Sequence, residues 1–242
     1  MYLITILGNI LIFLAVMLDT HLHTPMYFLS NLSLTDSCFI STTVLNIIVD
    51  IQTHSRAISY VGCLTQMSVF VIFICMDDML LSVMAYDRFV AICHPLHYSV
   101  IMSPQLCVFL LLISLLFSLL VTQLHNLIAL QLTCFNDVEI SNFFCHPSQI
   151  LNLACSSVTF TRNIVTYFVG AIFVVFPMSG ILFSYYKVIS SIMKILSSGG
   201  RYKAFLTCGS HLSIVCLFCR TGIGTYLGSS VSHSPRRVWW PQ

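Results

Sequence analysis

The stretch Met84–Tyr98, MAYDRFVAICHPLHY, places a charged pair at the end of a long apolar segment. The segment begins near Gly62 and is apolar enough to cross a membrane as a helix, which Pro95 then stops. Its last turns carry Asp87 and Arg88. An arginine beside an acid can hold a helix end to its neighbours, because its guanidinium is always charged and binds acceptors through a planar fork. Taken alone, the pair is explained more simply as a stop-transfer charge at the membrane surface.

The composition of the whole chain excludes a soluble protein. Of 242 residues, 57% are hydrophobic and only 7% are charged, whereas soluble domains carry about 25% charged residues. Most of the surface must therefore face lipid. The net charge of +2 is too small to indicate a nucleic-acid partner. The composition predicts an all-α membrane protein.

Hydropathy predicts six membrane helices, each near the ~20 residues that a helix needs to cross a bilayer. They are expected at about 1–18, 27–50, 63–91, 106–129, 161–189 and 205–229. Basic residues gather on one alternating side, which identifies that side as cytoplasmic: Arg88, Lys187, Lys194, Arg201 and Lys203. Only Arg56 and Arg162 flank helices on the other side. The longest polar stretch, 131–160, is therefore expected outside the cell.

Several polar residues lie inside the predicted helices, where lipid penalises them. Asn9, Asp36 and the pair Asp77-Asp78 are the clearest cases, and an acid near the helix centre costs roughly 2.5–3.5 kcal/mol. Asn9 and Asp36 could form a shared polar site, with or without a sodium ion. They could equally supply hydrogen bonds that hold helices together. Chemistry alone leaves both interpretations open.

The eleven cysteines divide by side and depth. Four are expected on the oxidising outer side, where disulfides form: Cys63, Cys134, Cys145 and Cys155. Four cysteines allow three pairings, and the residues alone do not choose among them. The others lie in helices or at their inner ends and behave as small hydrophobic residues.

No arrangement in the sequence indicates an enzyme, a metal site or a cofactor. Cys216 and Cys219 have a CxxC spacing, but an apolar helix lacks the polar surroundings that a zinc or redox site needs. The His94–His97 spacing belongs to a short turn. No nucleophile, base and orienting acid converge on one membrane face. A six-helix transporter or channel is less favoured, since the chain lacks an inverted repeat and broken helices.

Several strings together resemble the signatures of odorant receptors, a branch of the rhodopsin-like G-protein-coupled receptors. Besides MAYDRFVAICHPLHY, they are HTPMYF (23–28), ISYVGCLTQM (58–67), LACSS (153–157), SYYKV (184–188) and KAFLTCGSHL (203–212). They occur in the family's order and extend over residues 1 to about 235. The resemblance implies a rhodopsin-like helical bundle, of which this chain contains six of the seven membrane helices.

The resemblance also implies a cavity for a small volatile odorant in the outer half of the bundle. Its lining would be apolar, as pockets for small hydrophobic ligands usually are. The implied lining residues are Phe70, Val71, Ile74, Cys75, Gly170, Phe173, Gly222 and Tyr226. These residues could instead simply pack the bundle, and the sequence does not separate the two interpretations. The implied disulfides are Cys63–Cys145 and Cys134–Cys155.

Signalling, by the same resemblance, would run through a heterotrimeric G protein of the olfactory type at the plasma membrane. Outward movement of the sixth helix would expose the implied coupling residues, Asp87, Arg88, Lys203 and Thr207. Arg220 departs from the family, which usually has a small residue at this depth of the sixth helix. An unpaired arginine there is expected to disturb insertion or packing.

The end of the chain is a second departure. After Pro235 the family continues into a seventh membrane helix, whereas this chain reads RRVWWPQ. The codons for Val238–Pro241 contain, in another frame, a Val-Ala core similar to the start of that helix. We therefore expect one receptor domain over 1–235 and an aberrant, frameshifted tail over 236–242, which sequencing of the coding DNA tests. Without the seventh helix the bundle lacks one wall of the implied cavity and a partner of the third helix, which puts signalling activity in doubt. The alternative is a non-signalling, pseudogene-type membrane protein, retained in the endoplasmic reticulum or associated with intact receptors.

Overall fold

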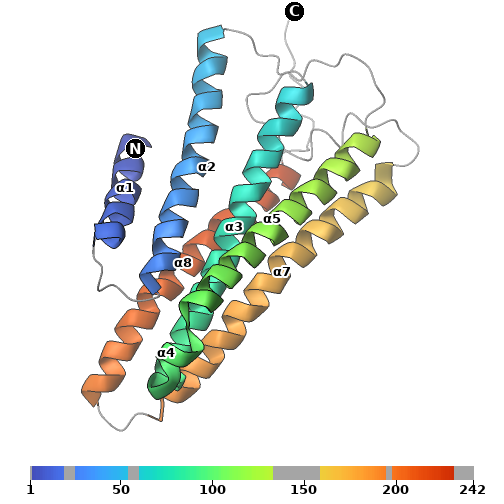
Figure 1. Cartoon of the computed structure of the whole chain (residues 1–242). Helices are drawn as coiled ribbons and strands as arrows, with labels where there is room; N and C mark the ends of the chain where they lie inside the picture. The colour runs from blue at the N-terminus through green and yellow to red at the C-terminus, as the bar shows by residue number, and fades with distance from the viewer. Residues whose placement is uncertain (1, 19–24, 54–59, 133–158, 195–197, 232–242) are drawn as a thin grey trace, which may run out of the picture. The chain divides into compact units, whose positions relative to one another are not determined.

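The computed structural model describes residues 2–18, 25–53, 60–132, 159–194 and 198–231, and within these ranges it contains helices and no strand (Figure 1). A helix covers each of the six expected ranges. The helices are α1 (Tyr2–Leu18), α2 (Pro25–Thr53), α3 (Tyr60–Cys93), η1 (Pro95–His97), α4 (Tyr98–Ile101), α5 (Pro104–Leu132), α7 (Thr159–Ile192) and α8 (Ser198–Val231). The expected tail, 236–242, lies outside the described residues.

Four helices in the described part of the chain are long and apolar enough to cross a membrane, compared with the six expected. They lie within α3, α5, α7 and α8, and α1 is apolar but has only 17 residues. Helix α2 carries a polar run from Ser30 to Ser37. Much of that polarity is satisfied inside the helix, because the hydroxyls of Ser33 and Ser37 donate to the carbonyls of Leu29 and Ser33. A hydropathy scale counts the side chains and misses these bonds.

By its contacts the chain divides into two units, Met1–Ser191 and Ile192–Gln242. In the first unit α3 packs against both α2 and α5, and α1 packs against α2 (Figure 1). Helix α7 reaches this group through ring contacts with α5, as described below. The second unit contains the whole of α8, a continuous helix from Ser198 to Val231.

The close contact of α5 with α3 has a clear cause in the sequence of α5. Ser114, Ser118 and Thr122 recur every four residues and are 0%, 0% and 2% exposed. Each hydroxyl donates to the carbonyl four residues earlier, at 2.8 Å. Small residues let helices approach closely in a membrane, and these bonds leave no hydroxyl proton unsatisfied. The opposite face of α5 exposes leucines to lipid, with Leu116 and Leu120 at 59% and 70%.

A second close approach joins α3 and α7. Pro177 lies inside α7 and is buried, and the helix continues past it, which membrane helices tolerate where neighbours satisfy the freed carbonyl. One turn later, a Cβ placed on Gly180 would lie 2.9 Å from the Ser82 hydroxyl of α3. In this arrangement of α7 on α3, any side chain at residue 180 would require Ser82 to move.

We predict that Gly180→Leu lowers the stability of the purified chain by about 1–3 kcal/mol, the usual cost of overpacking. Gly8→Leu is the matched control, since a Cβ at Gly8 meets nothing within 4 Å. Thermal unfolding in detergent micelles measures both. Equal melting temperatures for the two variants would contradict the close approach of α3 and α7.

Candidate functional site

The first candidate feature is the buried acid at the inner end of α3. Asp87 is 1% exposed, and its Oδ1 accepts a hydrogen bond of 2.8 Å from the hydroxyl of Tyr98. Its Oδ2 lies 3.9 Å from Nε of Arg88, which is an ion pair without hydrogen-bond geometry. Of these two partners of the carboxylate, the Tyr98 hydroxyl is therefore the stronger. Arg88 keeps 28% of its side chain exposed and can reach a partner.

The turn after α3 explains how Tyr98 returns to Asp87. Pro95 opens the 3₁₀ turn η1, where its missing N–H is not needed. The chain then enters the short helix α4 at Tyr98, whose N–H bonds the Pro95 carbonyl. Eleven residues along the chain separate Tyr98 from Asp87, and this turn brings them into contact. The proline of the CHPLHY string thus positions the tyrosine at its end.

Helix α7 also contacts the inner end of α3. The Sγ of Cys93 lies 3.0 Å from the Ser191 hydroxyl and 3.8 Å from the Lys187 carbonyl. Of the other expected coupling residues, Lys203 and Thr207 lie on α8 in the second unit. Their side chains are outside the described part of the structure, so their role stays a prediction.

Intramembrane acids meet between α2 and α3. The Thr35 hydroxyl and the Asp77 carboxyl are hydrogen-bonded at 2.5 Å, and Asp77 is 5% exposed. Asp36 lies near enough for its charge to act on Asp77. Asp78 is 7% exposed, and its Oδ1 has no hydrogen-bond partner in the described residues. The acid expected in a polar site, Asp36, therefore groups with the acids of α3.

A polar site shared with Asp36 was one of the two interpretations left open for Asn9. Its Nδ2 is buried and makes no hydrogen bond within the described ranges. The contact between Thr35 and Asp77 was missed from the sequence, although Thr35 stands directly before Asp36 in LSLTD. A threonine beside an intramembrane acid was the available signal.

The second candidate feature is an apolar cluster, called here the α3–α5–α7 cluster. Its buried members are Cys63, Met67, Val71 and Val121, and Leu64, Phe70, Cys75, Phe117 and Phe173 pack against them. Four of the eight expected cavity residues belong to this cluster, namely Phe70, Val71, Cys75 and Phe173. Ile74 is half-buried on α3 and Gly170 half-buried on α7. Gly222 and Tyr226 lie on α8, where the side chains are not described.

Aromatic rings connect the helices around this cluster. Phe117 of α5 meets Phe173 of α7 in a T-shaped contact of 5.4 Å between centroids, and Phe176 at 6.0 Å. On the other side, Phe70 of α3 meets Phe39 of α2 at 5.3 Å. Phe117 was not expected in the cavity, because hydropathy does not say which face of α5 turns toward α7.

The outer end of α3 carries the expected disulfide cysteine. Cys63 is fully buried and disulfide-bonded. The remaining described cysteines carry reduced thiols: Cys38, Cys75, Cys93, Cys107, Cys208, Cys216 and Cys219. Cys134, Cys145 and Cys155 lie outside the described residues, so the expected pairing Cys63–Cys145 stays a prediction.

Comparison with known proteins identifies the family. The sequence pattern of the olfactory receptors matches residues 1–238. The chain belongs to the olfactory receptor family. It is 68% identical over 238 residues to the human protein named olfactory receptor 7E24, covering 98% of this chain and 70% of that protein. It is 66% identical to mouse olfactory receptor 7E178, covering 98% of this chain and 72% of that protein.

A shorter relative matches as well. A rat protein named putative gustatory receptor clone PTE01 is 67% identical over 183 residues, which cover 76% of this chain and 98% of that protein. Family membership confirms the interpretation of the motifs, namely an all-α, multi-pass membrane protein of the rhodopsin-like, G-protein-coupled receptor type. It also confirms that the chain is a receptor by family and not an enzyme.

We predict that Thr35→Val destabilises the purified chain by about 1–3 kcal/mol, because it removes a hydrogen-bond partner from a buried carboxyl. Thr65→Val is the matched control, since Thr65 is exposed on α3 and donates to the carbonyl of Val61 in its own helix. Melting temperatures in micelles compare the two. A larger loss for Thr65→Val would contradict the assignment of Thr35 as the partner of Asp77.

Proposed function

We propose that this chain binds small volatile odorants in the α3–α5–α7 cluster and signals through a heterotrimeric G protein of the olfactory type at the plasma membrane. The observation that supports this most is the gathering of Phe70, Val71, Cys75 and Phe173 into one apolar cluster. An apolar lining with few polar groups suits a small hydrophobic ligand. The other proposed lining residues are Ile74, Gly170, Gly222 and Tyr226.

Helices α3 and α7 connect this cluster to the inner end of α3, where Asp87 and Arg88 are the proposed coupling residues. From Val71 to Asp87, α3 extends about 24 Å at 1.5 Å per residue. Helix α7 contacts the cluster through Phe173 and contacts Cys93 through Ser191. A ligand that favours one arrangement of α3 and α7 over another shifts the balance between receptor states. Continuous helices carry that shift from the ligand to Asp87.

The proposed coupling residues are Asp87 and Arg88 on α3 and Lys203 and Thr207 on α8. In the described structure the Asp87 carboxylate is held by Arg88 and Tyr98. Release of these contacts frees Arg88 to bind carbonyls or carboxylates of a G protein through its planar fork. Binding of a G protein to Arg88 therefore competes with the contacts that hold the Asp87 carboxylate.

A second candidate is a non-signalling membrane protein, retained in the endoplasmic reticulum or associated with intact receptors. Arg220 is the observation that favours it. This residue is exposed and lies well inside α8, Ser198–Val231. An arginine facing lipid costs about 2.5–3.5 kcal/mol near the centre of a membrane helix, which disfavours insertion of α8.

One experiment separates the two candidates. The chain is expressed in cultured cells with an epitope tag on its first residue, and both surface label and odorant-evoked cyclic AMP are measured. We expect surface label and ligand-dependent cyclic AMP, and we expect Arg88→Leu to abolish the cyclic AMP while keeping the label. Intracellular retention without any response supports the non-signalling candidate. In that case, recovery of surface label in Arg220→Gly identifies the arginine as the cause.

We further predict that Tyr98→Phe raises basal cyclic AMP about fivefold at equal surface label. The variant removes the hydroxyl that holds Asp87, and a loss of ~1 kcal/mol changes a two-state ratio by about that factor. Tyr86→Phe is the control, because the Tyr86 hydroxyl makes no hydrogen bond in the described residues and its ring contacts Phe89 at 6.0 Å. An unchanged or lower basal signal in Tyr98→Phe would show that this bond does not restrain the receptor.

A further inference from the structure

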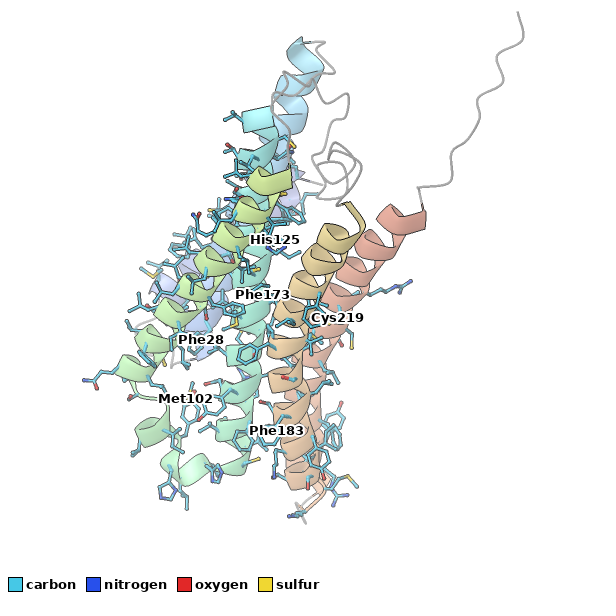
Figure 2. All side chains as sticks on the ribbon, turned by 90° about the vertical axis from the view of Figure 1, so that its right-hand side faces the viewer. Phe28, Met102, His125, Phe173, Phe183 and Cys219 are labelled. Atoms are coloured by element: carbon cyan, nitrogen blue, oxygen red, sulfur yellow. The ribbon has the colours of Figure 1, made fainter. Side chains whose placement is uncertain are left out.

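One polar ring stands at the edge of the α3–α5–α7 cluster. His125 of α5 is half-buried, and its ring centroid lies 6.5 Å from that of Phe173 on α7. Figure 2 labels both residues and shows them close together on these two helices. Phe173 itself packs on the buried members of the cluster. A molecule that occupies the cluster next to Phe173 therefore comes within reach of His125.

The hydrogen bond of His125 decides what its ring can offer. Nδ1 lies 3.0 Å from the carbonyl oxygen of Val121. A carbonyl oxygen can only accept, so Nδ1 carries the proton in this contact. In the neutral imidazole, Nε2 is then an acceptor with a free lone pair. No described residue donates a hydrogen bond to Nε2.

The neighbouring polar side chain does not compete for the same role. Asn126 follows His125 along α5, which turns it about 100° around the helix, toward α3. Its Oδ1 already accepts a hydrogen bond of 2.8 Å from the Ser68 hydroxyl of α3. Of the two side chains, His125 is the one that presents an unused acceptor on the side of Phe173.

We propose that the chain selects odorants that combine an apolar body with a hydroxyl group. This inference rests on the odorant-binding function proposed above. The body occupies the α3–α5–α7 cluster, and the hydroxyl donates to Nε2 of His125. Aldehydes, ketones, ethers and esters of the same size have no proton to donate. They leave Nε2 without a partner in an apolar setting, which disfavours their binding.

The test uses the purified full chain in lipid nanodiscs and three ligands of matched length: octan-1-ol, octanal and octyl methyl ether. Ligand-dependent shifts of the melting temperature give the affinities without any need for signalling. We expect octan-1-ol to bind about 3- to 10-fold more tightly than the other two, the range for one neutral hydrogen bond.

Two variants assign the preference to His125. His125→Phe keeps a ring beside Phe173 and removes the acceptor, so we expect it to bind all three ligands equally. His125→Gln places an amide near the position of Nε2, and because an amide both accepts and donates, we expect it to bind octanal about as tightly as octan-1-ol. Because His125→Gln keeps a polar group at this position, it still tests the proposal if His125→Phe does not fold.

Each outcome decides the proposal. Equal or tighter binding of octanal by the unmodified chain overturns it, as does an alcohol preference that survives in His125→Phe. Absence of stabilisation by every ligand overturns it together with the odorant-binding function. Alcohol-selective stabilisation without cyclic AMP in cells supports the site and overturns only the signalling part of the proposed function.

Discussion

Hydrogen bonds from side chains to the carbonyls of their own helix are the interaction on which the rest of this structure depends. In a lipid solvent no water satisfies a polar group, so each must find a partner inside the protein. Ser114, Ser118 and Thr122 do so within α5 and still present a narrow surface to α3. His125 continues the pattern with its bond to the Val121 carbonyl. The same kind of pairing that lets α5 pack closely on α3 also engages Nδ1 of His125 and leaves Nε2 as its acceptor.

The family and the positions of the helices could be predicted from the sequence, because both depend on local patterns. The MAYDRFVAICHPLHY string and the apolar runs need no knowledge of neighbours. The side-chain contacts that join one helix to another could not be predicted in the same way. Phe117 contacts Phe173 because of the rotation of α5 about its axis, and the apolar residues of α5 do not identify which face is turned toward α7. The hydrogen bond from Tyr98 to Asp87 depends on the turn at η1. The geometry of this turn cannot be read from the spacing of the residues in the sequence.

The polarity of α2 was the point at which hydropathy alone was misleading. Its serines and threonines lower its apolarity, yet several bond their own helix or the acid of α3. The acids on α3 do not all have hydrogen-bond partners among the described residues. Asp77 has a partner in Thr35, whereas Oδ1 of Asp78 has none among the described residues. Buried groups of this kind cost stability, and a group of acids with incomplete pairing is sensitive to small shifts of α2 against α3.

The contacts of α7 with its neighbours differ along its length in a way that suits a receptor. On the outer side of Gly180, the ring of Phe117 meets those of Phe173 and Phe176 at 5.4 and 6.0 Å between centroids. At the inner end, Cys93 and Ser191 make a directional contact of 3.0 Å. Between them, Gly180 lies directly on Ser82. Beyond Gly180, Ile181, Val188 and Ile192 of α7 are buried, so in the proposed mechanism a displacement of the outer rings is carried along a packed helix to its contact with Cys93. The missing side chain at residue 180 lets α7 lie against Ser82 of α3 between these two ends.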